Sequence, residues 1–359
     1  MHRMSRKLPK RAEPPRVVSP ERLCRSRRSS YFILWISLGL IPLGIHAADE
    51  SAAPPRPPDG YVALAPVMRS WGIPAERMSV EGAQTFANVW NSLELQHDSR
   101  EFRFNGLRVF MGDGAKAYGG ELWVSRIDVE KLFRPLLRQR EFEAEARPVR
   151  RIMIDAGHGG QDRGTYSDPL ALSEKEIALD VALRLGAILA QQGFEIRQIR
   201  EDDTFFEKGQ RAVMAQLEEA DLFVSIHFNA AGNPNAQGTE TYVLTPARQR
   251  STGDAATPIA GLGPESGNDT DPWNAVLGAE VHRALIDRLG TVDRGLKRAR
   301  FAVLRLAKMP AILIEAGFLS HEEEAREIAS PHRRGEIAEA IANGIVAYAN
   351  QVQAVQPKS

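Results

Sequence analysis

The sequence predicts an α/β protein: a layered domain with a mainly parallel sheet flanked by helices, preceded by a small α+β domain and a signal segment. Short apolar runs alternate with amphipathic stretches after residue 149, which is typical of strands joined by crossover helices. A Pro-rich linker over residues 49–59 separates these parts from a basic, then apolar, beginning. With 359 residues, 43% of them hydrophobic, the chain can form two domains with a sizeable core.

The first 48 residues have the pattern of an export signal. Residues 1–30 carry ten basic and two acidic side chains, a net charge of +8. The apolar run that follows is interrupted by Pro42 and Gly44 and ends in Ala47-Ala48, so it is short for a membrane span. We therefore expect a signal peptide over residues 1–48 and a periplasmic or otherwise secreted mature protein. An uncleaved signal anchor is the alternative.

The charge and the cysteine content describe the part that remains after export. The whole chain is neutral and residues 31–48 carry no Asp, Glu, Lys or Arg, so the mature protein has a net charge of −8. This acidic balance argues against nucleic acid as a partner. The only cysteine, Cys24, lies in the expected signal, so the mature chain has no disulfide. An exported protein without disulfides fits the bacterial envelope.

Residues 60–140 are expected to form the small α+β accessory domain. Asn105-Gly106 between two apolar stretches is typical of a tight β-hairpin. The expected elements are a helix over 62–71, a hairpin over 102–110, a strand over 122–124 and a helix over 127–137. The charged stretch 141–147 has no periodicity and is expected to be a second linker.

Residues 149–352 are expected to form the second domain. Its expected strands cover 150–155, 194–199, 221–226, 239–244 and 311–314, and its expected helices start after Ser173 and cover 211–219, 273–289 and 334–348. Ser173 and Glu176 have the spacing of a capping box, and Gly193 ends the helix that they open. The Gly/Pro/Ser/Asp-rich segment 245–274 is expected to be a mobile rim over the site.

Two histidines and two glutamates are the candidate site residues: His158, Glu174, His227 and Glu315. His158, His227 and Glu315 each follow an expected strand, and Glu174 lies in the first turn of an expected helix. Ligands and catalytic groups collect at the carboxyl ends of strands in open α/β sheets. The glycines that flank His158 allow the backbone to approach a metal closely: Gly157, Gly159 and Gly160.

These residue types predict a hydrolytic zinc centre. Two imidazoles and one carboxylate, from His158, His227 and Glu174, are a standard ligand set that leaves one position open for water. A further carboxylate must move the proton from water to the leaving group, and Glu315 is the candidate. Taken singly, Glu174 could instead stabilise a helix N-terminus, and Glu315 could be a paired structural acid.

Four segments together resemble the signatures of zinc-dependent N-acetylmuramoyl-L-alanine amidases of the type-3 family. They are Ile154-Asp-Ala-Gly-His-Gly-Gly160, Ser173-Glu-Lys-Glu-Ile-Ala-Leu179, Ala220-Asp-Leu-Phe-Val-Ser-Ile-His-Phe-Asn-Ala230 and Met309-Pro-Ala-Ile-Leu-Ile-Glu-Ala-Gly-Phe-Leu-Ser320. The resemblance implies zinc ligands at His158, Glu174 and His227 and a catalytic glutamate at Glu315. It also implies the substrate, which is the amide between muramic acid and the L-alanine of the peptidoglycan stem. No motif identifies an activator protein of the envelope.

Two other functions remain open from the residues alone. A zinc carboxypeptidase or other amidohydrolase on wall peptides would use a carboxylate-binding arginine such as Arg200, Arg211 or Arg294. A non-catalytic peptidoglycan-binding module would need no Glu315. Residues 60–140 loosely resemble the copper amine oxidase N-terminal-like domain of envelope proteins, which implies a wall-binding or spacer role and no copper.

Overall fold

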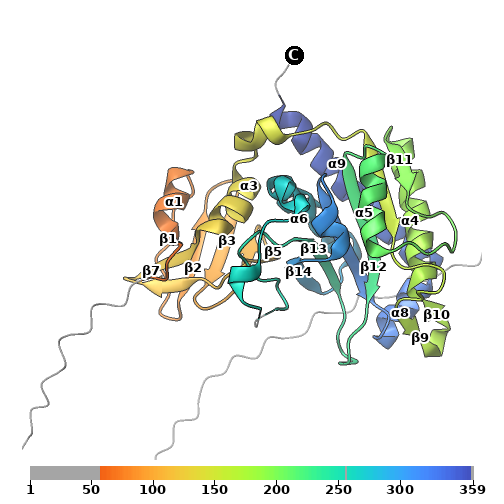
Figure 1. Cartoon of the computed structure of the whole chain (residues 1–359). Coiled ribbons are helices and arrows are strands. Elements are labelled where there is room, and N and C mark those ends of the chain that lie inside the picture. Colours follow the sequence, from red (N-terminus) through yellow and green to blue (C-terminus); the bar gives the residue numbers. More distant parts are fainter. Residues whose placement is uncertain (1–56, 255–256, 357–359) are drawn as a thin grey trace, which may run out of the picture. The chain divides into compact units, whose positions relative to one another are not determined.

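A computed structural model describes residues 57–254 and 257–356 and has the expected α/β architecture (Figure 1). The expected signal peptide over residues 1–48 lies outside these residues, as does most of the Pro-rich linker. The centre is a ten-stranded sheet. Its strands, in order across the sheet, are β11 (Glu195–Gln198), β8 (Arg151–Ala156), β12 (Leu222–Asn229), β15 (Ala311–Phe318), β13 (Thr239–Leu244), β14 (Asp293–Ala299), β5 (Leu107–Phe110), β4 (Glu101–Phe104), β3 (Ser92–Gln96) and β2 (Ala83–Ala87).

The sheet is mainly parallel after residue 149, as the sequence predicts. β11, β8, β12 and β15 pair in parallel, and β13 is antiparallel to β15 but parallel to β14. β14 then pairs in parallel with β5, after which β5, β4, β3 and β2 form an antiparallel meander. The accessory segment therefore extends the same sheet.

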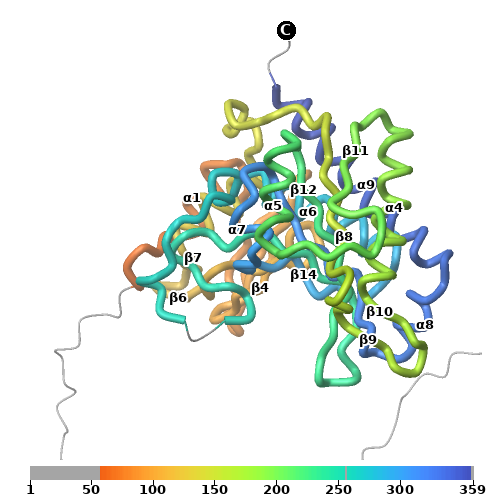
Figure 2. Tube along the Cα trace, turned by 45° about the vertical axis from the view of Figure 1, so that its right-hand side comes forward, coloured from red at the N-terminus to blue at the C-terminus, as the bar shows by residue number. Residues whose placement is uncertain are grey.

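Each face of the central strands has its own apolar core, because side chains alternate between the two faces of a strand. Ile152, Val224 and Ile312 pack in the core that includes α4 (Glu174–Gln191), α6 (Asp271–Leu289) and α9 (Pro331–Val355). Met153, Phe223 and Leu313 pack in the core that includes α5 (Lys208–Leu217) and α7 (Ala302–Leu306). α9 packs against both α4 and α6 (Figure 2).

The accessory segment carries a second sheet of three strands, in the order β1 (Tyr61–Ala63), β7 (Glu121–Ser125) and β6 (Lys116–Tyr118), next to α1 (Leu64–Ser70). The predicted hairpin is confirmed: Asn105 and Gly106 join β4 to β5 with φ values of 49° and 81°. Apolar side chains of this segment belong to the same core cluster as α4, α6 and α9. The domain boundary near residue 149 stays a prediction.

The remaining helical segments are shorter than the sequence suggests, or were not expected. The helix predicted over 127–137 consists of α2 (Arg126–Asp128), a π-helical turn (Val129–Phe133) and α3 (Arg134–Leu137). The charged stretch expected as a linker forms a 3₁₀ helix over Gln139–Glu145. Elements not expected are α7, β1, β2, β3, β6, β14, α8 (Glu322–Ala329), the two-stranded ribbon β9 (Tyr166–Ser167) and β10 (Leu172–Ser173), and 3₁₀ turns at Asp168–Leu170, Ile259–Gly261 and Ser266–Thr270.

The predicted capping box at the start of α4 is wrong. Ser173 is the N-cap residue, but its side chain makes no cap hydrogen bond. The backbone N–H groups of Glu174 and Lys175 instead donate to the carbonyls of Thr165 and Arg163. A preceding loop therefore satisfies these two helix donors, which a serine cap would otherwise help to satisfy. Gly193 follows the helix with a φ of 92°, as expected for its end.

No helix in the described parts of the chain is both long and apolar enough to cross a membrane.

Candidate metal centre

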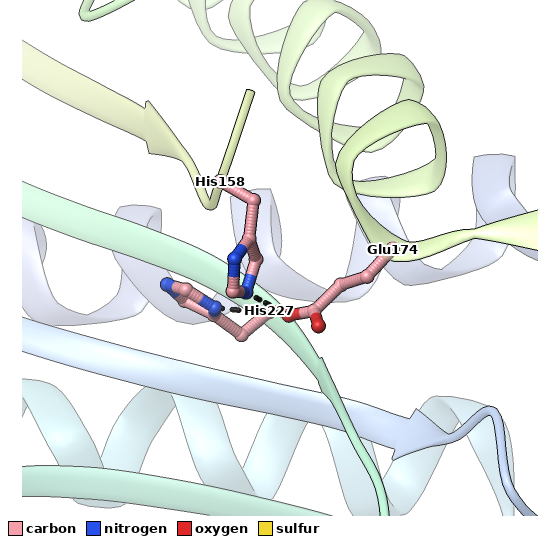
Figure 3. Close-up of side chains that lie close together, drawn as sticks. All are labelled: His158, Glu174 and His227. Carbon is pink, nitrogen blue, oxygen red and sulfur yellow. Dashed lines mark hydrogen bonds and ion pairs between the residues drawn. The ribbon is translucent and has the colours of Figure 1, made fainter. Parts of the chain in front are cut away.

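His158, Glu174 and His227 converge on one point (Figure 3). Oε1 of Glu174 lies 3.0 Å from Nε2 of His158 and 3.0 Å from Nδ1 of His227. One ligand atom from each of the three residues lies within 4.8 Å of the other two. This spacing allows a single ion to contact all three residues.

His158 sits in a strained turn two residues after β8. Its φ is 62°, in the left-handed region that non-glycine residues rarely adopt. Two buried arginines hold this turn through its carbonyl oxygens. Arg200 donates to the carbonyls of Ala156 and Gly157, and Arg211 donates to those of Ala156 and His158. Backbone strain of this kind persists only where the surroundings fix it, and the two guanidinium groups do so here.

His227 and Glu315 lie inside their strands, so the expectation that they follow strand ends is wrong in detail. β12 continues to Asn229 and β15 to Phe318, because Phe228 and Phe318 are still buried in pairing strands. His227 and Glu315 are direct neighbours in the parallel register of β12 and β15. Both share the alternation of Phe223 and Leu313, so they lie on the face covered by α5 and α7.

Glu174 is buried and held from both of its oxygens. The N–H of Phe228 donates to Oε1 and the N–H of Thr165 donates to Oε2. Burial alone would raise the pKa of Glu174, but the hydrogen bonds and charges of His158 and His227 lower it far below its ordinary value. The carboxylate is therefore ionised, as a metal ligand must be.

Two glycines lie so close to the ligand side chains that no Cβ would fit, but only one of them, Gly157, was predicted. A Cβ at Gly157 would lie 2.4 Å from the His227 ring. A Cβ at Gly164 would lie 2.5 Å from the Glu174 carboxylate, and Gly164 also has a φ of 64°. A Cβ at Gly159 would instead meet Thr204, and a Cβ at Gly160 would meet Phe205, so the predicted role of these two glycines beside the metal is wrong.

Glu315 is the unpaired acid of the site. Its Oε2 is buried and has no hydrogen-bond partner among the described residues. Burial, together with the negative charges of Glu174 and Glu240, raises its pKa well above the ordinary value. Glu240 is the neighbour of Glu315 in the antiparallel register of β13 and β15. A carboxyl group with a raised pKa and no fixed partner is suited to proton transfer near neutral pH.

The four candidate residues line one cavity of about 510 Å³. Asp162 also lines it, with Oδ2 2.9 Å from Nδ1 of His158 but not aligned as a hydrogen bond. The remaining lining residues are Thr165, Phe206, Lys208, Arg211, Phe228, Asn229, Ala230, Arg300, Phe301, Ala302, Val303 and Leu313.

The prediction that residues 245–274 form a rim over the site is wrong, because this segment lies elsewhere. None of its described residues lines the cavity. Instead, Arg100 of the accessory segment donates to the carbonyls of Arg250, Ser251 and Thr252, and buried Arg298 donates to Gln249. Arg100 therefore connects the segment to the accessory part of the chain, and Arg298 connects it to β14.

The sequence profile of the N-acetylmuramoyl-L-alanine amidase family matches residues 152–347, which is more than half of the chain. This chain belongs to that family. The amidase AmiC of Neisseria meningitidis is 34% identical over 225 residues, covering 57% of this chain and 53% of the relative. The amidase LytC of Bacillus subtilis is 34% identical over 197 residues, covering 55% of this chain and 35% of the relative.

The crystal structure of N-acetylmuramoyl-L-alanine amidase from Clostridium difficile 630 is 32% identical in sequence. The match covers 57% of this chain and 98% of that chain, with a TM-score of 0.47. The chain spans about half or less of the length of the two curated relatives. The family resemblance expected from the four sequence segments is confirmed.

The three arginines considered for a carboxypeptidase have other partners. Arg211 forms a buried ion pair with Asp155. The guanidinium of Arg200 donates hydrogen bonds to four backbone carbonyls. Arg294 pairs with Glu240 at 2.5 Å.

Four residues at or beside the cavity were not predicted from the sequence: Asp162, Gly164, Lys208 and Arg300. The Gly-Gly-x-Asp-x-Gly spacing after His158 could have indicated the first two; no local pattern indicates the others.

Proposed function

We propose that this chain is a zinc-dependent hydrolase that cleaves the amide between N-acetylmuramic acid and L-alanine in peptidoglycan. The observation that carries the proposal is the placement of Glu315 beside His227, next to three converged ligand atoms. Membership of the amidase family supplies the substrate class. Peptidoglycan is the proposed partner.

The chemistry of the donor set fits zinc. Two imidazole nitrogens and one carboxylate oxygen, from His158, His227 and Glu174, are a standard catalytic ligand set. All three residues line the cavity, so they would hold the ion where a substrate can reach it. Zinc, when bound there, supplies Lewis-acid polarisation and an activated water.

Glu315 performs the proton transfers in this proposal. Water adds to the lactyl carbonyl carbon, and Glu315 takes the proton that this water loses. The carbon–nitrogen bond then breaks, and Glu315 delivers the proton to the nitrogen of L-alanine, which leaves as an amine. Its buried Oε2, free of hydrogen bonds, can accept the proton without first giving up a partner.

Two alternative functions have less support. A carboxypeptidase would use Arg200, Arg211 or Arg294 to bind a terminal carboxylate, and all three are engaged elsewhere. A non-catalytic binding module gives no reason to bury an unpaired Glu315 beside a ligand set, since such a group costs free energy.

Mass analysis of digested peptidoglycan tests the proposal. Zinc-loaded protein should release stem peptides that begin with L-alanine and leave the glycan strands intact. The matched Glu315→Gln protein should release almost none. Loss of a terminal residue from the stems would point to a carboxypeptidase, and binding without any product would point to a wall-binding module.

Export and accessory roles complete the proposal. The basic and apolar beginning supports secretion to the periplasm or envelope, with cleavage near Ala47 or Ala48. Residues 60–140 are proposed to be a wall-binding or spacer module. N-terminal sequencing of protein recovered from the envelope checks the first point, since a chain that still begins near Met1 would contradict cleavage.

A further inference from the structure

Two cations in the cavity have no role in the proposed reaction. Lys208 is the first residue of α5, and Arg300 follows β14; both line the cavity that holds the metal centre. Lys208 is exposed and forms no hydrogen bond or ion pair with the described residues, although its charge lowers the pKa of Asp162 at longer range. The Arg300 side chain is only 16% exposed.

Backbone carbonyls hold the Arg300 side chain in place, but no carboxylate of the described residues lies within hydrogen-bond distance of its guanidinium. Its terminal nitrogens donate to the carbonyls of Pro246 and Gly263. The nearest acid, Glu265, is 4.0 Å away and lies closer to Arg305, at 3.4 Å. The Nε–H of Arg300 is buried and has no partner within the described parts of the chain. A buried, unpaired donor on a charged group costs free energy unless a ligand accepts its hydrogen bond.

The other charged groups of the cavity are already engaged. Asp162 lies against His158, and Glu174 contacts both histidines. Arg211 is paired with buried Asp155. Glu315 is the acid–base group of the proposed reaction and lines the same cavity. The positive charges of Lys208 and Arg300 are therefore the ones left for a ligand.

We propose that Lys208 and Arg300 form a receptor for a carboxylate on the peptide side of the substrate. This inference rests on the proposed function. The single carboxyl group of muramic acid is consumed in the amide that is cleaved, and the rest of the sugar carries neutral hydroxyl and acetamido groups. A free carboxylate can therefore come only from the peptide that leaves. Arg300 would contact the carboxylate from a fixed and partly desolvated position. Lys208 would contact it through a flexible side chain that is exposed to solvent.

The test compares two N-acetylmuramoyl-L-alanyl peptides. They differ only in whether the residue after L-alanine carries a free carboxyl group or a carboxamide. Wild-type protein should show a higher kcat/KM for the carboxylate. Arg300→Gln should reduce that preference by about tenfold to a hundredfold, as expected for a hydrogen bond to a charged group. Lys208→Gln should reduce it by about twofold to fivefold, because its charge is exposed to solvent.

Lys208→Gln removes no hydrogen bond or ion pair with the described protein, so its result does not depend on an intact loop around Pro246 and Gly263. Arg283→Gln is the matched control: Arg283 also donates to two backbone carbonyls but does not line the cavity. It should leave the preference unchanged. A wild-type protein without preference, or a preference that survives in both cavity variants, would overturn the receptor.

Binding of the same peptides to zinc-loaded Glu315→Gln protein separates this inference from the proposed function. Calorimetry should show tighter binding of the carboxylate peptide, and this difference should shrink when Arg300→Gln is added. Equal affinities for the two peptides would overturn the receptor. If neither peptide were cleaved by wild type but the carboxylate still improved binding, the proposed reaction would fail and the receptor would stand.

Discussion

Glu315 can be tested almost without disturbing the fold, because glutamine is nearly isosteric with glutamate. We expect Glu315→Gln protein to bind zinc normally and to lose about 10²–10⁴-fold in turnover, since a positioned acid–base is removed. The amide of glutamine cannot take the proton from water. Turnover on a muramoyl peptide, together with zinc content, measures both effects. Activity within a few-fold of wild type would rule out Glu315 as the base.

Glu240 gives a pH-dependent test beside the site. Burial alone would raise its pKa, but hydrogen bonds and charges from Lys297, Tyr242 and Arg294 lower it overall. A carboxyl group whose folded-state pKa is lowered stabilises the fold above its unfolded pKa of about 4.3 and loses this effect as pH falls through the folded pKa.

Glu240→Gln should therefore lower the free energy of unfolding by about 1.5–3 kcal/mol at pH 7, because the partly buried cations Lys297 and Arg294 lose their hydrogen bonds to a charged partner. The difference from wild type should be smaller at pH 3 than at pH 7, because part of the stabilisation is lost once the pH falls below the unfolded pKa of about 4.3. Urea unfolding at the two pH values measures it. An equal difference at both values would mean that the carboxylate charge is not what stabilises this cluster.

The four candidate residues could be predicted from the sequence because their types, order and glycine-rich surroundings are local features. The groups that surround them in the folded protein could not be predicted. Burial, then the charges of Glu174 and Glu240, raise the pKa of Glu315. Glu240 lies 75 positions earlier and becomes a neighbour only through antiparallel pairing of β13 and β15. The same holds for Arg300, whose partners Pro246 and Gly263 lie in a segment without periodicity.

At the scale of elements, the turn between β8 and His158 sets the distance between the two imidazoles. A Cβ at Gly157 would lie 2.4 Å from the His227 ring, so Gly157→Ala should displace that ring. We expect a loss of about 1–3 kcal/mol in stability from overpacking and weaker zinc binding.

Gly232→Ala is the control for this change, because an added Cβ there meets nothing within 4 Å. Thermal unfolding and chelator competition compare the two variants. If Gly157→Ala bound zinc as tightly as Gly232→Ala, the close approach of this turn to His227 would not matter for the site.

The apolar strands at the centre of the sheet were predictable from the sequence, and the highly charged strand β14 was not. β8, β12 and β15 are buried on both faces and read as continuous apolar runs. β14 has the sequence Asp-Arg-Gly-Leu-Lys-Arg-Ala, in which charges occupy most positions, so no strand was expected. Only in the folded protein do its three cations find their acidic partners, Glu240 and Asp128.

At the scale of the whole described unit, the accessory segment and the family domain share one sheet and one apolar core. A buried ion pair joins them: Arg298 on β14 donates to Asp128 of α2 at 2.8 Å. The pairing of β14 with β5 also covers an edge that would otherwise be open.

Deleting residues 57–147 should therefore destabilise the rest of the chain. Loss of Asp128 alone leaves a buried arginine without its acid, a change that typically costs about 3–5 kcal/mol. Thermal unfolding and sedimentation of the shortened chain, against a chain that begins at residue 57, measure stability and association through the open edge. A shortened chain as stable and monomeric as the longer one would show that the segment is only a spacer.

Zinc stoichiometry tests the central claim most directly. Elemental analysis of the purified wild-type protein should find one zinc per chain. His227→Ala protein, with its fold confirmed by circular dichroism, should lose that zinc, because two of the three ligand residues cannot hold the ion with comparable affinity. Stoichiometric zinc at the same site in the His227→Ala protein would contradict the proposed centre of His158, Glu174 and His227.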